Sequence, residues 1–293
     1  MIKKIIEFIK NYLKYYLVNK RKNKDIKILN DTETINLIID KKLSFCRYGD
    51  GEFKWMMNIK QDSFQKTSAK MGKELKNIFE SDNEKLLIGI PISIKSLKDN
   101  KLSAIRYWVN LYAQTNEMIL KILNPKVTYG NASVTRPYMD FKKGNFNQKF
   151  ANIKKLWENK KVLIAEGEYT KLGMNNDLFS KAKEVKRIIC PSNNAYDYVL
   201  DIEKSIKEVA SDFDICLVAL GPTATILASR LSSKIQTIDI GHIDIEYEWF
   251  LRKSKTKEVI AGKYTNETKE KLIEKDLVDE NYLAQIIKKI GVK

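Results

Sequence analysis

The chain has 293 residues, of which 43% are hydrophobic and 31% charged, with only 12 glycines and 5 prolines. These values are typical of a folded globular protein and argue against the fibrous and disordered classes. A surplus of lysine and arginine gives a net charge of +16. This charge attracts nucleic acid, anionic membranes or phosphorylated substrates without choosing among them, and a lysine-rich solvated surface explains it equally well.

The cysteine pattern and the lack of long apolar runs bear on the compartment. Cys46, Cys190 and Cys216 lie far apart, in or beside apolar runs. Their odd number and the lack of a Cys-x-x-Cys pair indicate buried thiols rather than a disulfide framework or a zinc site. No segment has the apolar length of a transmembrane helix, and the first ten residues lack a signal-peptide core and cleavage site. We therefore expect a cytoplasmic protein.

Residues 1–30 predict a basic amphipathic helix. Apolar residues recur at helical spacing from Ile2 to Leu17, and a basic run follows at residues 20–24. Such a helix packs on its own domain or on a partner subunit, which the pattern favours, or lies at the inner membrane face with its lysines toward anionic headgroups. Peripheral membrane contact through residues 1–24 therefore stays open.

Residues 31–262 predict an α/β fold, because short apolar runs rich in β-formers alternate with longer helical patterns. We expect a Rossmann-like, mainly parallel sheet with helices on both faces. The predicted strands are residues 43–46, 86–90, 127–129, 162–165, 187–190, 215–220 and 235–238. In such a sheet the ligand binds beyond the carboxyl ends of the strands, so the residues after each run are the site candidates.

Residues 263–293 are charged, with apolar positions at helical spacing between residues 265 and 290. This pattern predicts a C-terminal helical appendage.

The segment Arg47-Tyr48-Gly49-Asp50-Gly51-Glu52 directly follows the first of these predicted strands. Its glycines permit a tight turn, and Asp50 and Glu52 can converge on one Mg²⁺ or Mn²⁺ whose other ligands are water and phosphate oxygens. Arg47 could add a bidentate contact to a phosphate or carboxylate. A plain turn, with Glu52 at the start of a helix, explains the same residues without a metal.

Other strand ends carry polar loops but no standard nucleotide motif. Neither a Gly-x-Gly-x-x-Gly after a strand nor a P-loop occurs, so any nucleotide must be held by other loops. The candidates are residues 166–177, 190–195 and 221–225, which mix turn residues with hydrogen-bonding side chains. Helix capping by Asp177 or Ser192, and a helix start after Gly221, explain them without a ligand.

In residues 238–249, three carboxylates follow the only histidine at alternate positions. If this segment is extended, period two places His242, Asp244, Glu246 and Glu248 on one side of the strand. Crowded carboxylates are where shifted pKa values and general bases arise. A half-buried strand with a polar outer face explains the pattern equally well.

Taken together, these segments resemble the GT-D glycosyltransferase family. The resemblance spans roughly residues 31–262, and it is carried by residues 47–52, 166–168, 172–173, 176–179, 191–192, 194–195, 220–225, 239–244 and 246–249, in matching order relative to the strands. It implies a Rossmann-like sheet of GT-D type, a metal site at Asp50 and Glu52, and a uridine-diphosphate (UDP) sugar as donor and co-substrate. The implied acceptor is a glycan or glycoprotein.

On this resemblance we expect a hexosyltransferase that transfers a glucose-type hexose in surface polysaccharide or glycoprotein biosynthesis. Nucleic acid is not an expected partner, and the oligomeric state is not predicted. Lys171 stands where the family tends to have arginine, so bidentate phosphate binding is not expected there. The residues expected to bind the donor are Arg47, Arg136, Glu168, Lys171, Asn176, Asp177, Ser192, Asn194 and Thr223.

For the acceptor, we expect one carboxylate among Asp244, Glu246 and Glu248 to deprotonate a hydroxyl, with His242 orienting it. Direct in-line attack would invert the anomeric carbon. Two other classes stay open: a basic module that binds nucleic acid or a membrane surface, and another Rossmann-like metal-dependent phosphate enzyme.

Overall fold

The structure is a computed structural model, and it describes residues 2–22, 25–61, 63–272 and 279–292. Nine strands form one sheet in the order β1-β4-β3-β2-β8-β7-β5-β6-β9, and neighbouring strands run parallel. The strands are β1 (Lys27–Ile28), β2 (Ser44–Arg47), β3 (Leu86–Ile90), β4 (Thr128–Asn131), β5 (Lys161–Gly167), β6 (Glu184–Cys190), β7 (Ile215–Ala219), β8 (Thr237–Asp239) and β9 (Ile286–Lys289). All seven predicted strands are confirmed, as is the parallel α/β fold.

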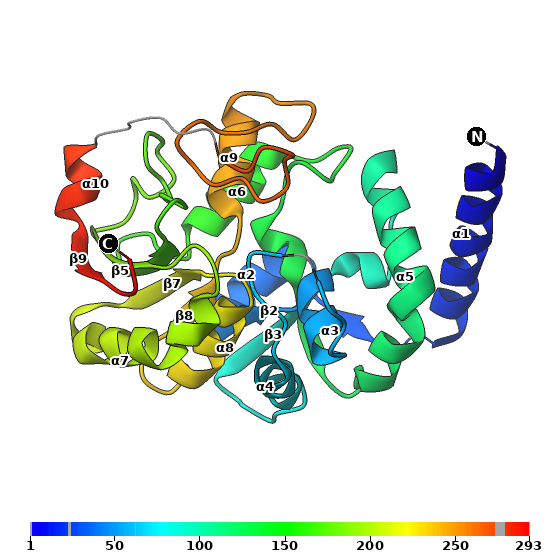
Figure 1. Ribbon diagram of the computed structural model, residues 1–293, viewed down its shortest axis with the longest axis horizontal. Helices are drawn as coiled ribbons and strands as arrows, with labels where there is room; N and C mark the ends of the chain where they lie inside the picture. The colour runs from blue at the N-terminus through cyan, green and yellow to red at the C-terminus, as the bar shows by residue number, and fades with distance from the viewer. Residues whose placement is uncertain (1, 23–24, 62, 273–278, 293) are drawn as a thin grey trace.

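The helices cover both faces of this sheet (Figure 1). The α-helices of the described residues are α1 (Ile2–Lys22), α2 (Asp31–Asp40), α3 (Asp50–Met56), α4 (Ala69–Phe79), α5 (Leu102–Ile122), α6 (Phe146–Lys154), α7 (Val199–Val209), α8 (Pro222–Leu231), α9 (Ile243–Leu251) and α10 (Glu280–Ala284). Side-chain caps start several of them: Asn30 and Glu33 form a reciprocal capping box at α2, and Ser68 caps α4.

Two apolar cores, one on each face, explain why the strands read as continuous apolar runs. Phe45 packs with α2 and α6 on one face, and its neighbour Cys46 packs with α4 and α8 on the other. Leu163 and Ile164 of β5 divide between the two cores in the same way. Because both faces of a central parallel strand are buried, both sets of side chains are apolar.

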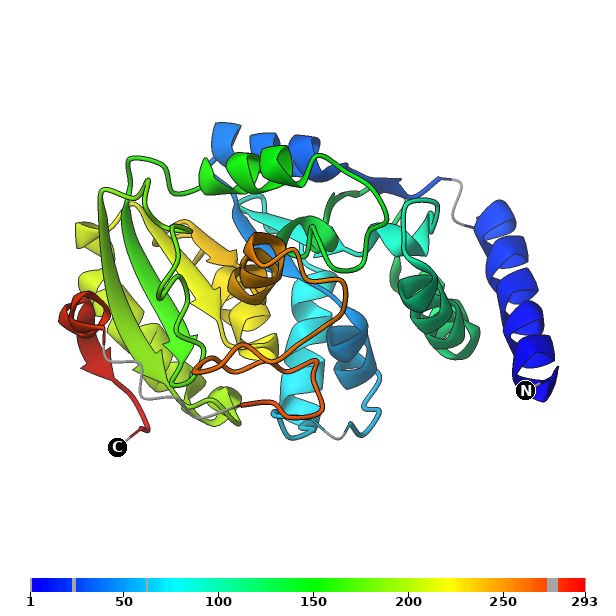
Figure 2. The same cartoon turned by 90° about the horizontal axis from the view of Figure 1, so that it is seen from above.

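The ends of the sheet differ. Helix α1 lies alongside α5 at one end, and α10 and β9 lie at the other (Figures 1 and 2). Along the described residues, no helix is both long and apolar enough to cross a bilayer.

The predicted C-terminal helix over residues 265–290 is wrong. In the described part of this segment, only Glu280–Ala284 is α-helical, and Ile286–Lys289 forms an edge strand beside β6. Residues 273–278 lie outside the described part of the chain. Pairing with β6 satisfies the backbone groups of this short segment, which outweighs the helical spacing of its apolar residues.

The extended conformation considered for residues 242–248 does not occur. Strand β8 ends at Asp239, the chain turns at Gly241 with φ +47°, and α9 follows from Ile243. Ile243 and Tyr247, four residues apart, then face the same apolar core. Helical rather than alternating spacing therefore decides which side chains point inward.

A buried ion pair attaches the C-terminal segment to the sheet. The Arg187 guanidinium lies 2.5 Å from the Glu166 carboxylate, and the Tyr282 hydroxyl of α10 donates to the same carboxylate at 3.0 Å. Arg187 also donates to the Leu172 carbonyl at 2.9 Å and to the Gln285 side chain at 2.7 Å. These bonds join β5, β6, the loop after β5 and α10.

We expect Arg187→Met to destabilise the fold by about 3–5 kcal/mol, because Glu166 would keep a buried charge without its cation. Urea unfolding measures this change. Lys181→Met is the matched control, since Lys181 and Glu158 pair at 2.7 Å with both side chains exposed, and such surface pairs contribute little. Equal shifts in the two variants would contradict the prediction.

Candidate active site

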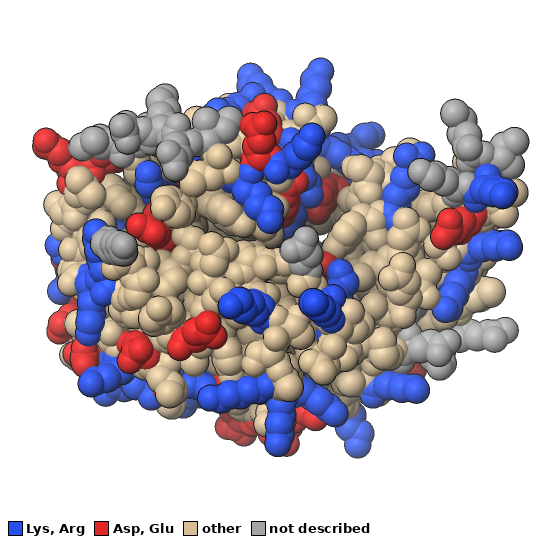
Figure 3. Space-filling view, in the orientation of Figure 1, with Lys and Arg blue, Asp and Glu red and all other residues tan. Residues whose placement is uncertain are grey.

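A cavity of about 720 Å³ lies beyond the carboxyl ends of the strands. The space-filling view shows this face hollowed near its middle, with charged side chains at the rim (Figure 3). The ends of seven strands, or the loops after them, line it, represented by Arg47, Ser93, Ser133, Gly167, Ser192, Gly221 and His242. Helix α5 adds Tyr107 and Trp108, and the segment after α9 adds Lys257 and Glu267. The expected position of the site, at the carboxyl edge of the sheet, agrees with this cavity.

Arg47 and Asp239 form an ion pair where β2 and β8 lie side by side. The Arg47 Nη2 atom lies 2.8 Å from Asp239 Oδ1, and Arg47 Nε donates to the Asp239 carbonyl at 3.1 Å. The Thr225 hydroxyl contacts the Arg47 carbonyl at 2.8 Å, and Gly241 N–H donates to Asp239 at 3.1 Å. Burial raises the pKa of Asp239, and Arg47 opposes that rise. The pair therefore fixes the Arg47 guanidinium at the cavity.

Asp50 and Glu52 lie in the first turn of α3, and both line the cavity. Glu52 accepts a hydrogen bond from Gly49 N–H at 2.9 Å, so it caps the helix, as the plain-turn alternative predicted. The Asp50 carboxylate accepts from the Tyr107 hydroxyl at 2.5 Å and from Lys54 at 3.2 Å. Burial raises the pKa of Glu52 to about 7.

These two carboxylates fit a divalent ion that takes only a few of its ligands from the protein. Side chains two residues apart on a helix do not face each other, and no cluster of three metal-binding side chains occurs among the described residues. An ion beside Asp50 and Glu52 would take its remaining ligands from water and phosphate oxygens, as Mg²⁺ and Mn²⁺ commonly do. It would also offset the cost of ionising buried Glu52.

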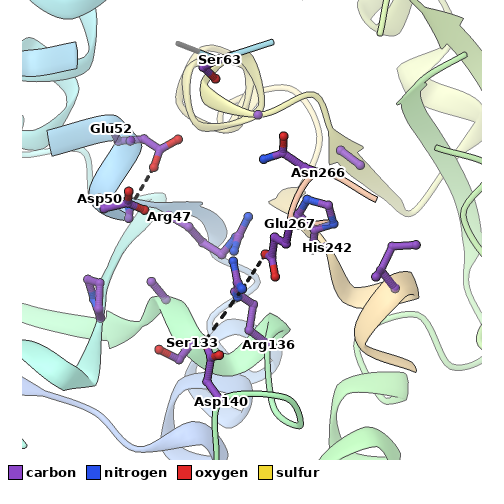
Figure 4. Close-up of a pocket in the computed structure, with 18 of the residues that line it drawn as sticks. Arg47, Asp50, Glu52, Ser63, Ser133, Arg136, Asp140, His242, Asn266 and Glu267 are labelled. Carbon is purple, nitrogen blue, oxygen red and sulfur yellow. Dashed lines mark hydrogen bonds and ion pairs between the residues drawn. The ribbon is translucent and has the colours of Figure 1, made fainter. Parts of the chain in front are cut away.

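A charged cluster around Arg136 lies in the same cavity, beside the Arg47 side chain (Figure 4). Arg136 lies 2.5 Å from the Glu267 carboxylate and 3.8 Å from Asp140, and Lys257 lies 2.9 Å from Glu267. Although burial acts to raise it, these cations and His242 hold the pKa of Glu267 at about 2. Burial lowers the pKa of His242 to about 4, which leaves its imidazole neutral near pH 7.

The three carboxylates of α9 all have partners. Asp244 and Glu248 bind the ammonium of buried Lys263 at 2.7 and 2.9 Å, and the Asn176 amide donates to both at 2.8 Å. Glu246 accepts two backbone N–H groups, those of residues 138 and 139, at 2.9 Å each. Of the three, only Asp244 lines the cavity. These bonds join α9 to the loops around it.

Half of the residues predicted to bind the donor, hold the metal or catalyse the reaction lie together around the cavity. The predicted residues that line the cavity are Arg47, Asp50, Glu52, Arg136, Ser192, His242 and Asp244. The others, Glu168, Lys171, Asn176, Asp177, Asn194, Thr223 and Glu248, are not part of its lining. Asn194 accepts from Lys66 N–H at 2.9 Å, Asp177 pairs with Lys154 at 2.9 Å, and Thr223 is fully buried within α8.

Several cavity residues were not predicted. Asp239, which pairs with Arg47 at the cavity, directly follows the predicted strand 235–238, so its position was a usable signal. Tyr107 lies inside a long helix, and Asp140 follows no predicted strand. Lys257 and Glu267 come from the segment after α9. No local pattern distinguishes these four from surface residues, because only the folded chain brings them to the cavity.

A fully parallel sheet with a cavity beyond the carboxyl ends of its strands is the architecture in which Rossmann-like proteins bind nucleotides. Within this class, the chain belongs to the GT-D fold glycosyltransferase family. The family model, described as "Glycosyltransferase GT-D fold", matches residues 45–268. The predicted GT-D glycosyltransferase family is therefore confirmed.

Two curated relatives are streptococcal. The chain is 32% identical over 269 residues to "Glycosyltransferase GlyD" of Streptococcus pneumoniae serotype 4, covering 90% of this chain and 33% of that protein. It is 32% identical over 247 residues to "Probable glycosyl transferase Gly" of Streptococcus gordonii, covering 83% and 36%. The chain thus spans about a third of the length of these relatives.

Solved structures agree on the fold. One, described as "The highly conserved domain of unknown function 1792 has a distinct glycosyltransferase fold", has a TM-score of 0.88 at 33% identity, covering 94% of this chain and 100% of that one. Another, described as "A New Glycosyltransferase (DUF1792) from Streptococcus sanguinis", has a TM-score of 0.85 at 31% identity, covering 91% and 100%.

We expect Gly241→Ala to destabilise the fold by about 2–4 kcal/mol, measured by urea unfolding. The backbone at Gly241 has a positive φ, and an added Cβ would overlap the Arg47 guanidinium held by Asp239. Gly144→Ala is the control, because a Cβ there meets Phe146 and Lys149 at 3.4 and 3.5 Å, which is ordinary contact. A Gly241→Ala protein as stable as this control would disprove the constraint.

The raised pKa of Glu52 predicts a pH dependence of stability. Between its usual value of 4.5 and about 7, the folded state keeps a proton that the unfolded state has released. The stability from this group is therefore complete below the lower value and is lost as pH rises through the upper one. Between about pH 5 and about pH 8, the free energy of unfolding of Glu52→Gln should therefore rise by about 2 kcal/mol relative to that of wild type.

Urea unfolding at a series of pH values, without divalent ions, tests this expectation. Glu80→Gln, at an exposed position, is the control. If the wild-type and Glu52→Gln stabilities keep a constant difference across the range, Glu52 does not titrate as stated.

Proposed function

We propose that the chain transfers a hexose from a UDP-sugar to a glycan or glycoprotein acceptor, with Mn²⁺ or Mg²⁺ at the donor diphosphate. The observation that carries this proposal is the charge of the cavity. Its lining has five acidic residues, Asp50, Glu52, Asp140, Asp244 and Glu267, against the basic residues Arg47, Arg136 and Lys257. A diphosphate entering this acidic lining needs added positive charge, and a divalent cation supplies it.

The donor side of the proposal assigns tasks to four residues. Asp50 and Glu52 would hold the cation, which when bound would neutralise the charge that develops on the departing diphosphate. Arg47, oriented by Asp239, presents its guanidinium to a phosphate. Arg136, beside Arg47, would also support the phosphates, in exchange for part of its contact with Glu267.

The acceptor side rests on His242 and Asp244. Among the proposed catalytic residues, His242, Asp244 and Glu248, these two line the cavity. We assign Asp244 as the base that takes the proton from the acceptor hydroxyl, and neutral His242 as the group that orients this hydroxyl. In-line attack with a single base would invert the anomeric carbon.

The biological setting follows from the class of reaction and acceptor. With a glucose-type hexose transferred to a glycan or glycoprotein, the chain would act in surface polysaccharide or glycoprotein biosynthesis. The printed names of the two streptococcal relatives support the class of reaction.

The test is release of UDP from UDP-glucose and related donors, with and without Mn²⁺. Asp50→Asn and Glu52→Gln should each lower metal-stimulated release by more than about 100-fold, because a metal ligand is lost. Glu80→Gln, an exposed carboxylate outside the cavity, should leave it unchanged. A single cooperative unfolding transition in each variant would show that the variants fold.

The product distinguishes the proposal from the rival phosphate enzymes. Release of UDP together with a free or transferred sugar supports a glycosyltransferase. Release of UMP or inorganic phosphate, or full activity of both carboxylate variants, would overturn the proposal.

A further inference from the structure

Helix α1 uses one face to attach to the domain. Tyr15 is buried on this face and stacks on Tyr112 of α5, with 5.7 Å between ring centroids. Its hydroxyl donates to the Ser93 carbonyl at 2.8 Å, and Lys14 donates to the Ala113 carbonyl at 2.9 Å. Helix α5 and the loop after β3 therefore cover this inner face.

The opposite face of α1 is also apolar, but it is exposed. We call it the outer face; it consists of Ile5, Ile6, Ile9, Leu13, Tyr16 and Leu17, each between 48% and 53% exposed. At 3.6 residues per turn these six side chains occupy a sector of about 120°. A solvated helix normally has one apolar face, so a second one indicates a second contact.

The charges of α1 indicate what this second contact is. Its 21 residues include seven lysines and arginines and a single acidic residue, Glu7. Lys3 and Lys10 are exposed along one edge of the outer face, and Figure 3 shows basic side chains over the region of α1. A stripe of aliphatic residues and tyrosine with lysines at its edge suits the boundary between headgroups and acyl chains.

We propose that the outer face of α1 docks on the surface of an anionic lipid bilayer. The helix lies in the plane of the headgroups, with Ile9 and Leu13 toward the acyl chains and Lys3 and Lys10 among the phosphates. The net charge of +16 adds long-range attraction. The contact is peripheral, and α5 lies between it and the cavity.

The test is co-sedimentation of the chain with vesicles of phosphatidylcholine alone or mixed with phosphatidylglycerol. Wild type should bind the mixed vesicles, and Ile9→Glu combined with Leu13→Glu should lower the affinity at least about tenfold. Lys3→Gln combined with Lys10→Gln should lower it about fivefold per lysine, and only for the anionic vesicles. Leu200→Glu, at a 64% exposed position on distant α7, is the matched control and should bind as wild type.

Unfolding curves and UDP release should match wild type in all these variants, since the outer face lies outside the cavity lining. Light scattering, which measures the oligomeric state, then shows whether the outer face binds lipid or a second copy of the chain. A dimer that the Ile9→Glu and Leu13→Glu variant converts to a monomer, without vesicle binding by wild type, would overturn the proposal. So would wild type that binds neither kind of vesicle, or a glutamate variant that binds as tightly as wild type.

Discussion

The cavity depends on the ion pair between Arg47 and Asp239 at the centre of the sheet. From β2 the chain continues toward one edge through β3 and β4, and it returns from the other edge through β7 to β8. The crevice at this reversal is bordered by one charged residue from each strand. Asp239 is buried, so it needs Arg47, and Arg47 is thereby held at the cavity. Gly241 lacks a Cβ because the guanidinium occupies that space.

The sequence was sufficient for the central strands and insufficient for the elements at the margins. Central parallel strands are buried on both faces, so they appear as unmistakable apolar runs. Strand β1 has two residues, and β9 is largely exposed at the edge, so neither has such a run. In α9 even the carboxylates of Asp244, Glu246 and Glu248 are buried. Their alternation with apolar residues imitates a strand, while their partners, such as Lys263, are distant in sequence.

The same reasoning separates the site residues that were predicted from those that were not. Arg47, Ser192 and His242 follow strands, and parallel topology alone brings strand ends to one edge. Tyr107 reaches Asp50 from a helix whose sequence carries no signal of a site. Glu267 reaches Arg136 from a segment that the sequence assigned to a separate appendage. Such contacts depend on how layers pack, which no short motif encodes.

The net charge of the chain is positive, whereas the charged residues that line its cavity are mostly acidic. The protein carries +16, yet acidic residues outnumber basic ones in the cavity lining. The basic surplus therefore lies outside the cavity, and part of it lies on α1. A negatively charged donor is not drawn into the cavity by arginine alone, so the carboxylates of Asp50 and Glu52 make sense as a cation site. The surplus outside remains available for an anionic surface, which separates the chemistry of the cavity from the docking of the protein.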